Sequence, residues 1–146
     1  MPVHIDYVHI NYTAVLVASV LQFIFGAIWY TPIFGKTWGK IHGFDKLSQD
    51  EQKKQMKSMW QLLVMQFMVT VVTTFVFALL LNGFPLDWNI YGLAGFFWLG
   101  FVLPTEVSAV LFSRTDRKRM ALQISIMAGA SLVCLEIAAV VLQYMK

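Results

Sequence analysis

Two acidic residues lie inside long apolar stretches of the sequence. Glu106 occurs in LPTEVSAVLF and Glu136 in LVCLEIAAVV. An acidic side chain at the centre of a membrane costs on the order of 2.5–3.5 kcal/mol on insertion scales, and such residues usually face a bundle interior and mark ion or proton pathways. The two residues therefore predict the binding or translocation of a proton or a small cationic solute.

Two amides, Gln22 and Gln66, lie in the first and second apolar stretches, close to the expected depth of Glu106. At 1.5 Å per helical residue, Glu106 is about 10 Å from one end of its stretch, and Glu136 is about 12 Å from the opposite end of its own. The two acids are therefore not expected to pair directly. The predicted binding or translocation residues are Glu106, Glu136, Gln22 and Gln66.

Membrane helices must position these side chains. Hydrophobic residues make up 58% of the 146 residues and charged residues 13%, whereas soluble domains have about 45–50% and about 25%. The apolar residues form four stretches of about 20 residues, the length that crosses a bilayer as a helix. The sequence predicts one all-α membrane domain over residues 1–146, a four-transmembrane-helix bundle with spans at Ile10–Tyr30, Met59–Leu81, Ile90–Phe112 and Met120–Tyr144.

The basic residues are concentrated in two loops. Residues 31–58 hold six lysines and residues 113–119 hold four basic residues, so ten of the eleven lie on one side of the predicted bundle. The positive-inside rule places these loops in the cytoplasm and both termini outside, in a multi-pass protein of the cell membrane. This distribution predicts contact with membrane lipids and no binding to nucleic acid.

Each predicted span carries small or polar residues at helical spacing, which suggests the face that meets other helices. One interpretation is a hydrated path, and since four spans rarely enclose a path alone, a homo-oligomer is then expected. The other is a non-catalytic scaffold or subunit, in which the same residues only pack helices or chains together. By span, the residues are Asn11, Ala18, Gln22 and Gly26; Gln66, Thr70 and Thr73; Gly92, Gly95, Glu106 and Ala109; and Ser125, Gly129, Glu136 and Gln143.

The segment WYTPIFGKTWGK, residues 29–40, follows the first span. Its proline is expected to end or bend the first helix, because the residue before proline disfavours the helical region. Aromatic rings then recur at the spacing of a short helix that lies at the membrane surface, and a ligand site capped by the Trp-Tyr pair is the alternative. The predicted interface residues are Trp29, Tyr30, Pro32, Phe34 and Trp38.

Ser48 and Glu51 have the spacing of a capping box. The pair predicts a helix that starts in the first basic loop and runs through QKKQMKSMW into the second span.

The pattern W-Y-T-P-x-F-G-K-x-W at the end of the first span resembles an uncharacterised membrane family, domain of unknown function 1761. The resemblance covers the whole chain, with four spans and basic first and third loops. It implies the four-span fold and no particular activity.

The sequence has no nucleotide-binding loop, CxxC pair or HExxH zinc motif, and no serine in a span has a histidine near it. We therefore expect a protein that is not an enzyme and that has no cofactor and no metal. The weakest alternative is a metal site outside the membrane formed by His4, Asp6 and His9.

Overall fold

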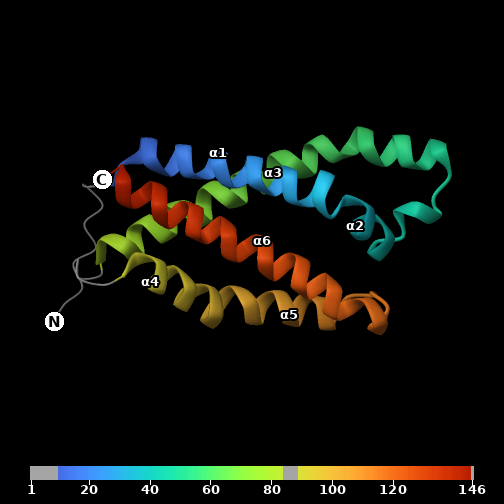
Figure 1. Ribbon diagram of the computed structural model, residues 1–146. Helices are drawn as coiled ribbons and strands as arrows, with labels where there is room; N and C mark the ends of the chain where they lie inside the picture. The colour runs from blue at the N-terminus through green and yellow to red at the C-terminus, as the bar shows by residue number, and fades with distance from the viewer. Residues whose placement is uncertain (1–9, 84–88, 146) are drawn as a thin grey trace.

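The computed structural model describes residues 10–83 and 89–145, and within these ranges the chain is all-α, with no strand. Figure 1 shows the helices as a long bundle. The α-helices are α1 (Tyr12–Ile28), α2 (Gly35–Ile41), α3 (Gln49–Gly83), α4 (Ile90–Phe97), α5 (Leu103–Leu111) and α6 (Arg117–Tyr144), joined in part by the π-helical turns η2 (Trp29–Ile33) and η4 (Trp98–Val102) and the 3-10 turn η3 (Phe44–Lys46).

Four helical segments are long and apolar enough to cross a membrane, as predicted: Tyr12–Ile33, Gln49–Gly83, Ile90–Leu111 and Arg117–Tyr144. The chain is thus a multi-pass membrane protein. We call the end that holds α2, η3 and residues 112–116 the basic end, and the opposite end, where the side chain of Asn11 donates to the carbonyl of Met145, the terminal end.

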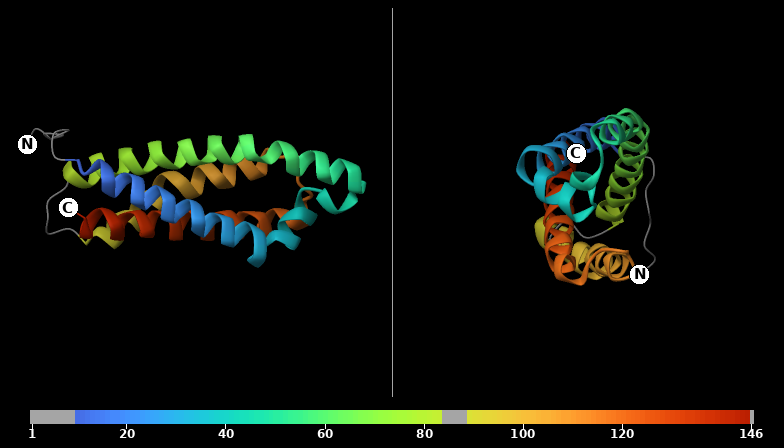
Figure 2. Two further views of the ribbon diagram at one scale, coloured as in Figure 1. Left: turned by 90° about the horizontal axis from the view of Figure 1, so that it is seen from above. Right: turned by 90° about the vertical axis from the view of Figure 1, so that its right-hand side faces the viewer.

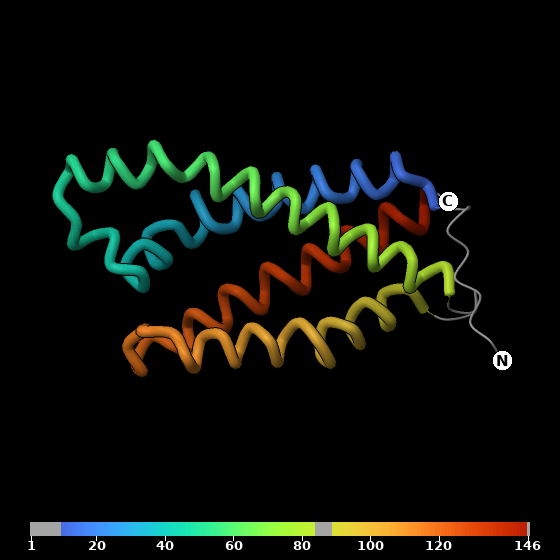
Figure 3. The backbone as a smooth tube through the Cα atoms, turned by 180° about the vertical axis from the view of Figure 1, so that it is seen from behind, coloured from blue at the N-terminus to red at the C-terminus, as the bar shows by residue number. Residues whose placement is uncertain are grey.

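The last helix, α6, is the centre of the bundle. It contacts α1, α3, α4 and α5, and Figures 1 and 2 show it running diagonally between α1 on one side and the α4–α5 segment on the other. Helix α3 crosses α1 on the far side (Figure 3) and contacts it directly. Any polar group on α6 can therefore meet groups from several spans.

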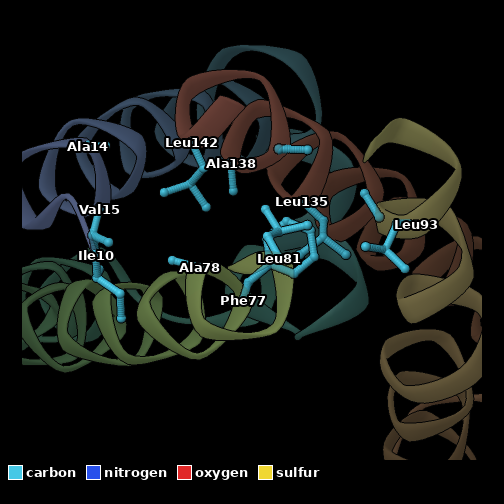
Figure 4. Packing of buried hydrophobic residues seen from close by; sticks show 12 residues of the cluster. Ile10, Ala14, Val15, Phe77, Ala78, Leu81, Leu93, Leu135, Ala138 and Leu142 are labelled. Carbon is cyan, nitrogen blue, oxygen red and sulfur yellow. The ribbon is translucent and has the colours of Figure 1, made fainter. Parts of the chain in front are cut away.

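The hydrophobic core is concentrated toward the terminal end, where small residues let α1, α3, α4 and α6 come together (Figure 4). Ala14 is 1% exposed, Ala94 and Ala139 are fully buried, and Phe77 is 3% exposed. Close approach through small residues is the usual basis of helix association in membranes, because lipid chains supply no hydrophobic driving force between helices. The basic half of α3 lacks such contacts and remains exposed from Lys53 to Gln66.

Both prolines of the first and third spans accompany a π-helical turn rather than the end of a helix. Proline has no N–H to donate, and at Pro32 the chain instead closes a wider turn, with the amide of Phe34 donating to the carbonyl of Trp29 at 3.0 Å. The first span therefore continues to Ile33, three residues beyond the predicted boundary. In the third span, the turn η4 comes immediately before the helix that contains Pro104.

Helix α3 begins as the capping box predicted. The backbone amide and the hydroxyl of Ser48 each donate to Glu51 Oε2 at 2.9 Å, and the amide of Glu51 donates back to the Ser48 hydroxyl at 3.3 Å. The helix has 35 residues and is about 52 Å long, against about 30 Å for the apolar core of a bilayer. Its polar first turns, which include Glu51, therefore extend beyond the membrane at the basic end.

Candidate functional site

The centre of the candidate site is a hydrogen-bonded chain that joins the third and fourth spans. Ser131 Oγ of α6 donates to Glu106 Oε2 of α5 at 3.1 Å. Ser131 Oγ also accepts a hydrogen bond from Trp98 Nε1, at 3.0 Å, from the turn η4. The indole thus fixes one lone pair of the serine oxygen, which leaves its single proton available for the carboxylate.

Only one of the two Glu106 oxygens takes part in this chain. Within the described residues Oε2 is bonded to Ser131, and no donor reaches Oε1. The Tyr30 hydroxyl of the first span and the Cys134 thiol of α6 are both close enough to interact electrostatically with Glu106. Tyr30 itself has no hydrogen-bond partner among the described residues. A half-buried carboxylate oxygen and a phenol hydroxyl are thus both left available for a bound species.

A second polar contact ties the first span to α3. Gln22 Nε2 donates to Thr74 Oγ1 at 2.8 Å, and both residues are buried, with Gln22 6% exposed and Thr74 fully buried. The Cys134 thiol points at the Gln22 carbonyl across 3.8 Å. Since Cys134 also lies near Glu106, polar groups from all four spans follow one another across the bundle.

Trp29 is partly buried and is held by contacts with the last span. Its Nε1 donates to the carbonyl of Ile126 on α6 at 3.0 Å, and its ring lies against Gly129. The ring also contacts Phe25 and Phe34, with centroids 5.4 and 4.8 Å away. The indole N–H is therefore satisfied by a protein carbonyl, and the position of the ring at headgroup level stays a prediction.

The remaining residues of the predicted interface motif make further contacts. Tyr30 and Trp38 meet edge to face at 4.8 Å, and the Trp38 ring contacts His42 at 4.4 Å. Pro32 is exposed, whereas Phe34 and Trp38 are partly buried. The short helix α2 predicted from this segment is present. Its contact with lipid headgroups stays a prediction, and the ring contacts extend from α2 to the Tyr30 side chain near Glu106.

Two of the predicted polar faces are covered only in part. In α3, Gln66 and Thr73 are exposed and Thr70 is partly buried, and the fully buried residue is Thr74, one position beyond Thr73. In α6, Ser125 and Gln143 are exposed and Glu136 is partly buried, whereas Gly129 packs against the Trp29 ring. Helical spacing identifies which residues share a face, but it does not say which of two mixed faces is covered. Gln66 therefore does not join Glu106, and its side chain has no partner among the described residues.

The two intramembrane acids occupy different settings, as expected from their depths. Glu136 belongs to the partly covered stripe of α6, is partly buried, and has no hydrogen-bond or ion-pair partner in the described part of the chain. Glu106 is bonded to Ser131. The predicted site residues thus separate into Glu106 with nearby Tyr30, a Gln22–Thr74 contact next to it, and Glu136 and Gln66 elsewhere.

Sequence reasoning missed Ser131, Trp98, Thr74 and Cys134 as members of this arrangement. Single serine, threonine and cysteine residues are common in membrane helices, so their type alone carries no signal. Among residues 10–83 and 89–145, no group of three or more His, Cys, Asp or Glu is placed to hold a metal. His4, Asp6 and His9 lie outside the described residues.

The model of one protein family, described as a protein of unknown function (DUF1761), matches residues 13–143. The chain belongs to the DUF1761 family. No curated protein and no solved structure matches it. The matched range of DUF1761 includes the aromatic segment after the first span, Glu106 and Glu136, so all the candidate residues lie within the family domain.

Proposed function

We propose that this DUF1761 protein binds a proton or a small cation at Glu106 and carries it across part of the membrane, without covalent chemistry. One observation carries the proposal: Glu106 lies within a membrane span, is only half-buried, and keeps Oε1 free while Ser131 holds Oε2. A carboxylate that served only to join helices would be expected to use both oxygens, because an unpaired polar atom in a membrane is costly.

Ser131 can accommodate both states of the carboxylate. Its hydroxyl lies 3.1 Å from Glu106 Oε2 and 3.2 Å from the carbonyl of Ala128 on its own helix. A hydroxyl has one proton, so it donates to one of these two acceptors at a time. When Glu106 is charged, the proton points to the carboxylate. When Glu106 has bound a proton or a cation, the serine can turn to Ala128 while Trp98 keeps its bond to the serine oxygen.

The route to Glu106 starts, in this proposal, at the basic end. Ten basic residues lie at that end, and the charge bias supports a cytoplasmic location for it, with the terminal end outside. The Tyr30 hydroxyl lies on this route, since Tyr30 belongs to η2 and packs against Trp38 of α2. A cation entering there would meet a phenol and then a carboxylate.

The test is flux into liposomes that contain the purified protein, with protons followed by a trapped pH-sensitive dye and Na⁺ by a trapped sodium dye. We expect flux above that of empty liposomes for the wild type, and flux at the empty-liposome level for Glu106→Gln. Glutamine keeps the shape and the bond to Ser131 but has no charge.

Glu136→Gln is the matched control, because it removes the other intramembrane acid and should leave flux unchanged. Thermal unfolding in detergent shows whether each variant is folded. Wild-type flux equal to that of empty liposomes for both ions, or a folded Glu106→Gln variant with wild-type flux, would overturn the proposal.

A further inference from the structure

One face of α6 remains polar and uncovered at membrane depth. Ser125 and Gln143 are exposed, Val140 is 36% exposed, and Glu136 between them has no partner within the described residues. Trp29 of the first span covers the start of this face at Gly129, whereas Glu136 is partly buried and its carboxyl has no hydrogen-bond or ion-pair partner among the described residues. We call Glu136, Val140 and Gln143 the α6 outer face.

Exposure to lipid is an unfavourable environment for such a face. Glu136 is eight residues from Tyr144, so it lies about 12 Å below the terminal end of the helix. At that depth lipid chains offer no hydrogen bonds, and ionisable residues are almost always paired or turned toward protein or water. The described residues of the protomer supply no such partner for Glu136, which favours a partner outside the protomer.

We propose that the α6 outer face is the contact with a second copy of this chain, with the protonated carboxyl group of Glu136 in each copy hydrogen-bonded to the Glu136 carboxyl of the other. Two copies inserted in the same orientation are related by a two-fold axis along the membrane normal. In such an isologous pair each residue meets its own counterpart at the same depth. Glu136 then finds a polar partner at its own level, and Gln143 finds another about two turns further out.

The spacing of the face fits a helix pair. Glu136 and Gln143 are seven residues apart. A seven-residue repeat keeps the same face of two helices in contact when they cross at about 20° in a left-handed pair, the commonest geometry in membrane bundles. Val140, four residues after Glu136, lies beside this line and would pack across the contact.

A second copy fits this face better than an unrelated subunit, because the polar groups need no separate matching surface: symmetry places the same carboxyl and the same amide opposite each other. The proposal is independent of the function assigned to Glu106. Ser131, which binds Glu106, is five residues from Glu136 and therefore about 140° away around α6.

The first test is disulfide cross-linking in native membranes, in the full-length chain carrying Cys134→Ala to remove the native thiol. Val140→Cys should form a cross-linked dimer on mild oxidation. Val76→Cys is the matched control, because Val76 is 47% exposed and lies near the same end on a different helix, α3, outside the proposed contact. Equal cross-linking at both positions, or none at Val140, would contradict the proposal.

The second test measures association between labelled copies in lipid vesicles by energy transfer. Glu136→Leu should weaken association by about tenfold or more, the size expected for loss of an interhelical polar contact, while Glu136→Gln should retain it through paired amides. Gln66→Leu, at an exposed amide of α3, should have no effect. Thermal unfolding of the Glu136→Leu monomer should match wild type, since Glu136 makes no hydrogen bond or ion pair within the described residues and leucine can fill its partly buried position. Wild-type association of Glu136→Leu would exclude this contact.

Discussion

The indole ring of Trp29 occupies the space beside Gly129 that any side chain at residue 129 would need. A methyl group added to Gly129 would lie 3.0 Å from Cζ2 of the indole, closer than carbon atoms pack comfortably. The same ring donates from Nε1 to the carbonyl of Ile126, one turn earlier on α6. Gly129 of α6 and Trp29 of η2 thus form one packing contact between the first and last spans.

Gly129→Leu should destabilise the protein by about 1–3 kcal/mol, the usual cost of forcing extra carbon atoms into a filled site. The measurement is thermal unfolding in detergent. Gly100→Leu is the control, since a methyl group at residue 100 would have no neighbour within 4 Å. Equal unfolding temperatures for the two variants would mean that Trp29 does not hold this position.

Ser131→Ala should reduce proton or Na⁺ flux by about tenfold or more, because a hydrogen bond to a charged group contributes about 1.5–3 kcal/mol. Ser131 is a positioning residue that acts through Glu106. Ser131→Thr keeps a hydroxyl at the same place and should restore flux. If only a small side chain were needed at residue 131, the Ser131→Ala variant would show the same flux as the wild type. The hydrogen bonds from Trp98 through Ser131 to Glu106 would then have no part in binding.

The orientation of the protein can be tested with impermeant thiol reagents on intact cells, in the background that lacks Cys134. A cysteine at Lys46, in η3 of the basic end, should be protected until the cells are opened. A cysteine at Tyr144, which is 78% exposed at the terminal end, should be labelled at once. The reverse pattern would place the basic end outside and invert the proposed route to Glu106.

The start of α3 should loosen in acid. The backbone amide and hydroxyl of Ser48 donate to Glu51 and hold the pKa of that carboxyl below its ordinary value of 4.5. Stabilisation by a carboxylate with a lowered pKa is complete above the ordinary value and is lost as the pH falls through the lowered one. Hydrogen exchange of the amides of residues 48–52 should therefore accelerate relative to the rest of α3 as the pH falls below that ordinary value and through the lowered one. Glu51→Gln should abolish this dependence, and its persistence in that variant would assign it to another group.

The spans were predictable because their signal is composition over about 20 residues, and the capping box was predictable because Ser48 and Glu51 are local in sequence. The buried faces of the helices were less predictable. Gln22 was correctly expected to point inward, but Thr74 rather than Thr73 is its neighbour, since one residue turns a helix by about 100°. The partner of Glu106 was not predictable at all, because Ser131 is 25 residues away and its approach depends on how α6 crosses the other spans.

The π-helical turn η4 changes which residues of the third span share a face, and α-helical spacing could not predict this change. Gly92 and Glu106 were placed on one stripe by counting through an uninterrupted helix, yet η4 lies between them. The structure leaves Gly92 exposed and Glu106 half-buried. Counting residues at helical spacing is reliable within α5, and it correctly relates Glu106 to Val110. The same count fails across η4.

The same turn has a consequence for changes in chain length. A π-helical turn holds about one residue more than an α-helical turn, so removing one residue from η4 can convert it to ordinary helix while both flanks keep their directions. Removing one residue from α5 offers no such adjustment, and everything on one side of the gap must rotate by about 100°. A deletion of Gly100 should therefore leave Glu106 facing Ser131, and a deletion of Leu103 should not. Across the family, we expect length differences within the third span to occur at this turn, because the wider turn can lose one residue without rotating the helices on either side.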